Sequence, residues 1–320
     1  MQRKLKNSQA LLIALASIAI GAAPSLAQQA NDNTDPLEPI RVLIRQHQLS
    51  AAESKARSFV SQYPFSASGH FLLGYILFSE KKATESLAEY TSGARFRTPG
   101  AEDLMAVGAD YVLLNDNADA DKWFSKVTEM EPANALAWYY LGRTRFYENQ
   151  YEDAIKAFQT CLQLNPNDVR AETNMGLAYK ELGRDADAIA AFQQAIAWEE
   201  KAGGRDAQPY LDLGSFLFGV GKTEQSLPYL LKAVDLEAGN PKTHEELGRA
   251  YDKLHREVDA EAELRKAVAL APEASSLHYT LGRILKNEGK DADAAGEFAI
   301  TSRLNGTRSS KDVPNFDLQP

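Results

Sequence analysis

The feature that most constrains the fold of this chain is a glycine that returns at a fixed spacing. The glycines follow one another at intervals of 34 residues, apart from one interval of 38: Gly74, Gly108, Gly142, Gly176, Gly214, Gly248 and Gly282. Twelve residues after each of them stands an alanine or a serine, and four residues later a large apolar residue follows, as with Ala154 and Phe158. Prolines recur at one further phase: Pro132, Pro166 and Pro272. The chain therefore repeats one structural unit.

Physical chemistry assigns a role to each recurring position. Alanine, leucine, lysine and glutamate are abundant, which favours helix. Glycine inside a helix costs about 0.5–1 kcal/mol, so its recurrence predicts a close crossing of two helices, with the alanine or serine opposite it. The large apolar residue lies on the same helical face as that small residue, and we expect it to fill the seam between units. In the units that have it, the proline ends the second helix.

The repeat resembles the tetratricopeptide repeat, a helix–turn–helix unit of 34 residues. The unit Ala135–Asp168 matches it best, through Trp138, Leu141, Gly142, Ala154, Phe158 and Pro166. The resemblance implies an all-α fold, a right-handed α-solenoid of stacked helix–turn–helix repeats. We count seven repeats over residues 67–304 and a divergent N-terminal repeat over residues 37–66. The four extra residues lie within 199–208, where we expect a longer loop, either a hinge or a tolerated surface insertion.

The N-terminus is typical of a secretory signal peptide over residues 1–27. Basic residues open it, and the apolar run Leu11–Ala23 that follows is too short to span a bilayer comfortably. Ser25-Leu26-Ala27 supplies the small residues of a cleavage site, and an uncleaved anchor is the alternative. We expect a disordered linker at 28–36 and a C-terminal tail at 305–320, either loose or folded back over the last helix pair. The predicted location is the bacterial periplasm or the cell exterior.

Charge and cysteine content narrow the classes of function. The formal net charge is -9, and it becomes -12 without residues 1–27, which hold three basic residues and no acid. Such a chain gains nothing from the counterion release that drives nucleic-acid binding. Cys161 is the only cysteine, so no intramolecular disulfide can form, and its phase predicts a small buried hydrophobe.

The residue types that carry catalysis or bind metals do not occur in suitable patterns. His70, His244 and His278 each lie four residues before a repeat glycine, where the best repeat has Trp138, so we expect a shared structural position for all four. No metal-ligand spacing and no phosphate-binding loop is present, and the segment Phe218–Lys222 is better explained as a turn between helices. We therefore predict no catalytic residues, no cofactor and no metal, and we expect that the protein is not an enzyme.

The remaining candidate for a functional site is the surface of the repeats. In the tetratricopeptide repeat family the first helices of successive units line the concave face. The resemblance therefore implies a groove lined by the corresponding positions of this chain, with mainly aromatic residues in its first half and basic residues in its second. These positions hold Phe71, Tyr75, Met105, Tyr139, Arg143, Arg170, Lys242, Arg249, Lys253, Arg283 and Lys286. A basic cluster in an acidic protein favours an acidic ligand, and aromatic residues anchor peptides. The chaperone-binding members of the family are excluded, because Tyr139 and Arg143 occupy the places of their opening Lys–Asn pair.

The leading hypothesis is a non-catalytic interaction scaffold that binds a protein or peptide segment with an acidic portion, in the periplasm or outside the cell, in envelope assembly or secretion. The alternative is a carrier of a peptide, small ligand or glycan in the same groove, and a structural spacer comes third. A closed deep pocket would favour a carrier, an open groove a scaffold, and a groove without an apolar patch a spacer.

Overall fold

The computed structural model describes residues 35–311, with side chains to residue 306. This part of the chain forms sixteen helices and no strand. It divides into two compact units between Pro166 and Asn167. Unit 1 contains α2 (Glu38–Arg45), α3 (Leu49–Gln62), α4 (Ala67–Ser79), α5 (Ala83–Ala94), α6 (Ala101–Leu113), α7 (Asn117–Met130), α8 (Ala135–Tyr147) and α9 (Tyr151–Leu164). Unit 2 contains α10 (Val169–Glu181), α11 (Asp185–Ala202), α12 (Gln208–Gly219), α13 (Thr223–Leu236), α14 (Pro241–Lys253), α15 (Glu257–Leu270), α16 (Ser275–Asn287) and α17 (Asp291–Lys311).

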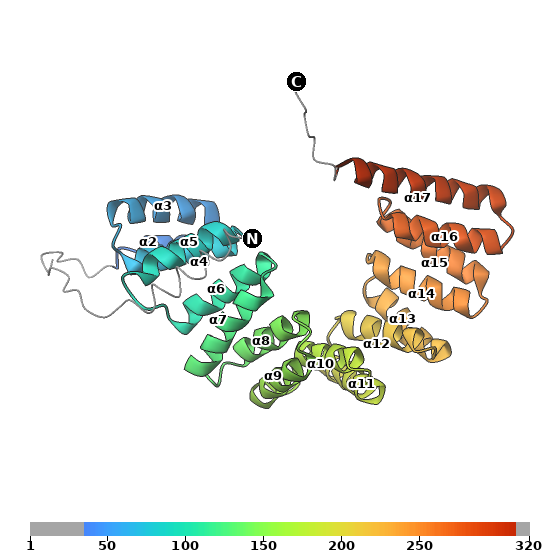
Figure 1. Ribbon diagram of the computed structural model, residues 1–320, viewed down its shortest axis with the longest axis horizontal. Helices are drawn as coiled ribbons and strands as arrows, with labels where there is room; N and C mark the ends of the chain where they lie inside the picture. Colours follow the sequence, from blue (N-terminus) through green and yellow to red (C-terminus); the bar gives the residue numbers. More distant parts are fainter. Residues whose placement is uncertain (1–34, 312–320) are drawn as a thin grey trace, which may run out of the picture. The chain divides into compact units, whose positions relative to one another are not determined.

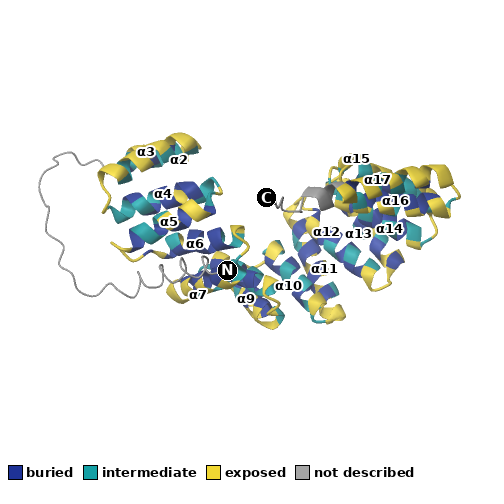
Figure 2. Ribbon diagram, turned by 45° about the horizontal axis from the view of Figure 1, so that its top comes forward, coloured by how far each residue is buried: buried dark blue, intermediate teal, exposed yellow. Residues whose placement is uncertain are grey.

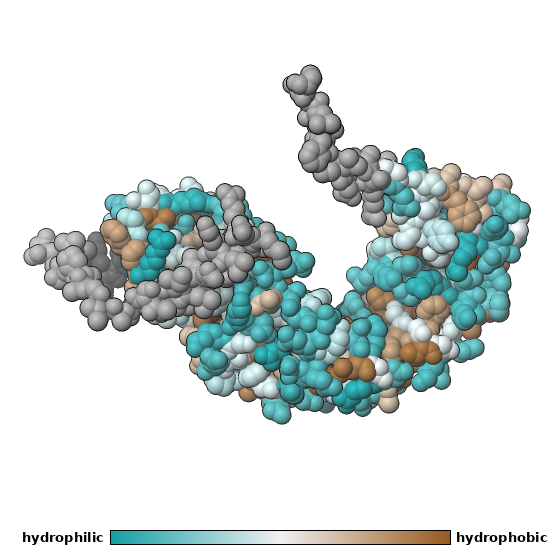
Figure 3. Space-filling view, in the orientation of Figure 1, coloured by the Kyte–Doolittle hydropathy of each residue, from teal (hydrophilic) through white to brown (hydrophobic). Residues whose placement is uncertain are grey.

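Within each unit the helices form antiparallel pairs that stack on their neighbours (Figure 1). The first helix of a pair begins at a side-chain cap in several repeats, as where Asn134 Oδ1 accepts a hydrogen bond from the Ala137 N–H at 3.1 Å. The second helix ends two residues before the recurring proline, at Leu164 before Pro166 for example. Buried residues follow the faces where helices meet (Figure 2), and the visible surface is mainly hydrophilic, with separate hydrophobic patches (Figure 3).

The repeat glycines lie where two helices of one pair cross. A Cβ added at Gly142 would lie 2.6 Å from the Phe158 ring, and one at Gly214 would lie 2.7 Å from Leu230. The large apolar residue thus packs directly on the glycine of its own pair, whereas we had expected it in the seam between units. The small residue is also close, since the Ser86 hydroxyl donates to the Gly74 carbonyl at 2.9 Å. The close crossing is confirmed, and the ring occupies the space that a side chain at the glycine would take.

The predicted shared position of three histidines and Trp138 is confirmed. The Trp138 indole N–H donates to the Pro132 carbonyl at 2.9 Å, six residues earlier. Nε2 of each histidine faces the carbonyl six residues earlier at 2.9–3.0 Å, and Nδ1 faces a glutamate carboxylate of the second helix at 2.6–2.7 Å: His70 with Glu89, His244 with Glu263, and His278 with Glu297. The ring therefore ties the first helix to the preceding connection and to the second helix of its pair. Cys161 is buried, as predicted.

Three boundaries differ from expectation. The four extra residues lengthen α11, which has 18 residues, instead of the loop after it, and Gly203 ends that helix in the left-handed conformation at φ 66°. One hydrophobic core continues across this connection, and the division of the chain lies at 166/167. The helix α17 runs to Lys311, into the expected tail, because the first helix-breaking proline is Pro314. Asp35 and Pro36, the end of the expected linker, begin the turn into α2. The predicted signal peptide and the remaining tail and linker residues lie outside the described residues.

Candidate functional site

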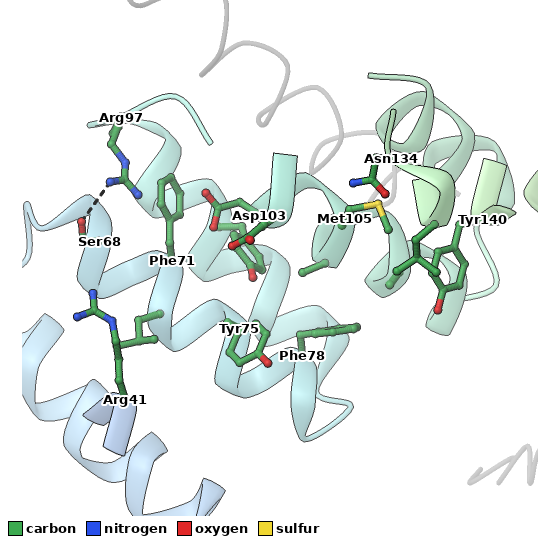
Figure 4. Close-up of a pocket in the computed structure, with 16 residues that line it drawn as sticks. Arg41, Ser68, Phe71, Tyr75, Phe78, Arg97, Asp103, Met105, Asn134 and Tyr140 are labelled. Carbon is green, nitrogen blue, oxygen red and sulfur yellow. Dashed lines mark hydrogen bonds between the residues drawn. The ribbon is translucent and has the colours of Figure 1, made fainter. Parts of the chain in front are cut away.

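A cavity of about 790 Å³ lies on unit 1 between the first helices of successive pairs. It is partly open to solvent, and α4, α6 and α8 supply most of its lining (Figure 4). Three predicted groove residues, Phe71, Tyr75 and Met105, line it together. Its volume falls in the range of ligand-binding clefts, which lies at about 300–1,000 Å³.

The wall of the cavity is apolar because small residues let aromatic rings pack deeply. Phe71 is buried against Tyr90, with ring centroids 6.1 Å apart. A Cβ added at Gly93 in α5 would lie 2.4 Å from the Phe71 ring, so only glycine leaves room for it. Tyr75 remains 45% exposed and Leu136 also 45%, which leaves apolar surface for a ligand to cover.

Polar groups that the sequence analysis missed surround this wall. The Arg97 guanidinium lies over the Phe71 ring, 5.0 Å from its centroid, and donates to the Ser68 hydroxyl at 3.3 Å. Arg41 lines the cavity as well and pairs with Asp35. Asp103 accepts a hydrogen bond from the Gly100 N–H at 2.9 Å. One feature of the sequence could have indicated that the connection holding Arg97 is unusual. It has no proline at the position that corresponds to Pro132.

The other predicted residues of unit 1 lie on α8. Tyr139 is buried, with its ring 6.2 Å from that of Phe158. The Arg143 guanidinium lies between two tyrosine rings, 5.8 Å from Tyr139 and 5.9 Å from Tyr147. Burial lowers the pKa of the Arg143 guanidinium, but the hydrogen bonds that it donates to Tyr147 and Tyr139 and their charge interactions outweigh burial, so that the pKa is raised. Neither Tyr139 nor Arg143 belongs to the lining of the cavity.

Apart from Arg143, the predicted basic residues lie in unit 2, where acidic side chains accompany most of them. Lys242 pairs with Glu246 at 2.7 Å, and Arg249 contacts the same carboxylate at 3.4 Å. Arg283 pairs with Asp252 at 2.9 Å. Arg170 pairs with Asp168 at 3.1 Å, while Lys253 and Lys286 are exposed and make no ion pair with any described residue. Much of the predicted basic charge is therefore matched within the unit.

Three carboxyl groups have pKa values that burial raises. Burial raises the pKa of Asp110 to about 7, although the nearby Ser86 hydroxyl lowers it. The pKa of Glu172 also rises to about 7. The pKa of Asp212 rises to about 6, although a hydrogen bond from Gln208 lowers it.

In the described part of the chain no three His, Cys, Asp or Glu residues gather as a metal site would require. Between residues 35 and 311, no helix combines the length and the apolar character needed to cross a bilayer.

Comparison with known proteins identifies the repeat. Tetratricopeptide repeat models match residues 40–102, 135–168 and 170–201. Anaphase-promoting complex subunit 3 of Schizosaccharomyces pombe is 21% identical over 211 residues, which are 65% of this chain and 31% of that protein. The chain spans well under half the length of the curated relatives it matches.

Solved structures agree in fold. A tetratricopeptide repeat protein from Parabacteroides merdae is 19% identical and superimposes with a TM-score of 0.63 over 78% of this chain and 97% of that one. The anaphase-promoting complex hetero-tetramer Cut9-Hcn1 gives a TM-score of 0.58 at 18% identity, over 86% of this chain and 54% of that one.

Proteins of this family generally mediate protein–protein contacts and are generally non-catalytic. With its recurring glycine, its stacked helix pairs and these matches, the chain belongs to the tetratricopeptide repeat family.

Proposed function

We propose that this protein is an exported, non-catalytic scaffold that binds a segment of a partner protein in the cavity of unit 1. The observation that carries the proposal is the partly open cavity, whose aromatic wall leaves Tyr75 and Leu136 half exposed. Exposed aromatic residues in a cleft are the usual anchors of a bound peptide. A spacer would have no need of such an apolar cleft.

The place of action is the periplasm or the cell exterior, in envelope assembly or secretion. This part of the proposal is supported by the sequence. Basic residues at the N-terminus, the apolar run Leu11–Ala23 and a cleavage site after Ala27 follow one another in the order found in signal peptides. An uncleaved anchor would hold the same repeats at a membrane surface. Cell fractionation followed by N-terminal sequencing checks this part, and the expected first residue of the mature chain is Gln28.

Partner capture is best tested with a photo-crosslinking amino acid placed at Tyr75 in the full chain. Placed there, it should yield a covalent adduct with one partner in the cell envelope, and mass spectrometry should locate the adduct in one segment of that partner. Lys156 is the control position, because its side chain is 72% exposed on α9 and lies outside the cavity. Adducts of equal yield at both positions, or none at Tyr75, would contradict the proposed groove.

A carrier of a peptide, small ligand or glycan is the second candidate. The cavity volume favours it, since small-molecule sites have volumes of the same size. Native mass spectrometry of the protein purified from its own cells separates the two functions. A bound molecule of less than about 1 kDa that is lost on Met105→Glu substitution would establish the carrier and replace the scaffold.

A further inference from the structure

We propose that Arg97 is an anion anchor at one end of the unit 1 cavity, which selects a partner segment with an acidic residue next to a large apolar one. The inference rests on the proposed groove and adds the chemistry of its ligand. In this proposal the acidic part of the ligand contacts Arg97 in unit 1, whereas the sequence had predicted that it contacts the basic residues of unit 2.

The first argument is that Arg97 is held in place without a carboxylate. Its guanidinium stacks on Phe71 and donates to Ser68, and no described acidic residue forms an ion pair with it. A guanidinium carries five N–H donors in a planar fork that fits a carboxylate in a bidentate manner. The single recorded hydrogen bond, at 3.3 Å, leaves most of these donors available. Figure 4 shows the side chain beside Phe71, at the end of the cavity opposite Tyr140.

The second argument is that the local chain directs Arg97 there. The helix α5 has 12 residues, whereas α7 and α9 have 14, so the connection from Arg95 to Gly100 is longer than the one after α7. Gly93 lets Phe71 pack under the last turn of α5, and the buried ring forms a platform for the cation. An arginine stacked on an aromatic ring loses less freedom when it binds an anion.

The other charges at the cavity do not compensate Arg97. Asp103 accepts the Gly100 N–H in the first turn of α6, where the helix dipole stabilises its charge. Arg41 is paired with Asp35 and lies 3.8 Å from Glu38. Glu102 is exposed and makes no ion pair within the described residues. An incoming carboxylate would therefore meet Arg97 as the one cation of the lining that is without an acidic partner.

The third argument fixes the second half of the ligand. Tyr75 lines the cavity together with Phe71 and keeps almost half of its surface exposed, and Met105 lies further along the lining, beside Asn134 (Figure 4). A large apolar side chain would cover this surface while a neighbouring acidic side chain reaches Arg97. The occupant is a peptide segment of a partner protein, with Asp or Glu within a few residues of Phe, Leu, Ile or Met.

The test is a selection from a random peptide library displayed on beads, carried out with the full chain and with two charge reversals. Arg97→Glu removes the anchor. Arg95→Glu is the matched control, because it changes the net charge equally two residues away and Arg95 does not line the cavity. We expect the unaltered chain and Arg95→Glu to enrich peptides with an acidic residue next to a large apolar one. Arg97→Glu should lose that acidic enrichment by about tenfold while keeping the apolar preference.

A selected peptide and its Glu→Gln or Asp→Asn version then serve as probes in fluorescence anisotropy. Removing the charge should weaken binding to the unaltered chain about tenfold and should not weaken binding to Arg97→Glu, where the new carboxylate repels the acidic peptide. Selected peptides without acidic residues, or an equal acidic enrichment with Arg97→Glu, would overturn the anchor and leave the groove standing. Peptides that bind equally after Tyr75→Ala, or no selected peptide, would overturn the groove and the anchor with it.

Discussion

At the scale of single residues, Asp110 is the most unusual member of the core. Its side chain is fully buried in α6, and neither carboxylate oxygen has a hydrogen-bond partner. The Ser86 hydroxyl close to it donates to the Gly74 carbonyl. An ionised carboxylate without a partner is costly to bury, which is why the pKa of Asp110 rises from 3.8 to about 7. The native state therefore holds a proton that the unfolded chain releases between these two pH values.

This proton makes stability depend on pH. Because the folded pKa is the higher one, the free energy of unfolding falls as pH rises from about 4 to 7, and the loss is complete above the folded pKa. Asp110→Asn cannot ionise, so it should be more stable than the unaltered chain at pH 8, by about 1–4 kcal/mol. At pH 4.5, close to the unfolded pKa, most of this difference should be lost. Urea unfolding at both pH values measures it, and an equal difference at both would show that ionisation is not the cause.

The repeat glycines give a second prediction at this scale. Gly142→Ala would place a methyl group 2.6 Å from the Phe158 ring, so the pair must move apart, and we expect a loss of about 1–3 kcal/mol. Gly296 in α17 is the matched control, because a Cβ there would meet nothing within 4 Å. Gly296→Ala should stabilise the chain by about 0.4–1 kcal/mol. Thermal unfolding of the two variants should therefore show shifts of opposite sign.

At the scale of the helix pair, the turn between the two helices always has a left-handed residue. It lies seven residues after the repeat glycine, or after Ile40 in the first pair. Four pairs of unit 1 and four of unit 2 share it: His47, Lys81, Asn115, Asn149, Gly183, Gly221, His255 and Gly289. Glycine adopts this conformation without strain and asparagine tolerates it, whereas histidine and lysine do so at a cost of about 1–2 kcal/mol.

The strained turns can be relieved. His255 has φ 56° and is exposed, with its side chain 90% accessible, so its removal costs little packing. His255→Gly should raise the free energy of unfolding by about 0.5–1 kcal/mol, after the added freedom of the unfolded chain is subtracted. His255→Ala keeps the strain and serves as the control. If both variants change stability equally, the turn conformation is not responsible.

The helix pairs also show what the sequence could and could not predict. Spacing located every pair between residues 37 and 304, because glycine, the small residue and the ring are required at each crossing. Spacing could not place Arg97, whose position depends on the early end of α5 and on the ring of Phe71. It also could not show that Glu246 would take up the charges of both Lys242 and Arg249, since ion pairs depend on side-chain rotamers. The remaining assignments to the groove stay predictions.

At the scale of the whole molecule, the described chain has separate hydrophobic cores. Phe124 lies in a core of unit 1 that extends from Phe71 to Ala157, and Phe192 lies in a core of unit 2 that extends from Ala188 to Ala294. In a repeat protein each pair contacts its neighbours only, so stability is local. Damage to one core should therefore remain within that unit.

Hydrogen exchange can measure this independence. Phe124→Ala removes a fully buried ring and should cost about 3–5 kcal/mol, with faster exchange in α6, α7 and α8 and little change in α12 to α15. Phe192→Ala should give the reverse pattern. Uniformly faster exchange in both units after either substitution would contradict separate cores.

The extended α11 has a consequence for how such a chain can change in length. Four added residues amount to about one helical turn, so the residues beyond them return to almost the same face and stand about 6 Å further along the axis. Glu199, in the added turn, accepts the Asp206 N–H at 2.8 Å and so folds the connection back toward α12. An insertion of two residues would have rotated every later contact to the opposite side. A helix of such a pair can therefore lengthen by a whole turn. The added turn provides extra surface on which a new contact can evolve, while the packing of the helix pairs is unchanged.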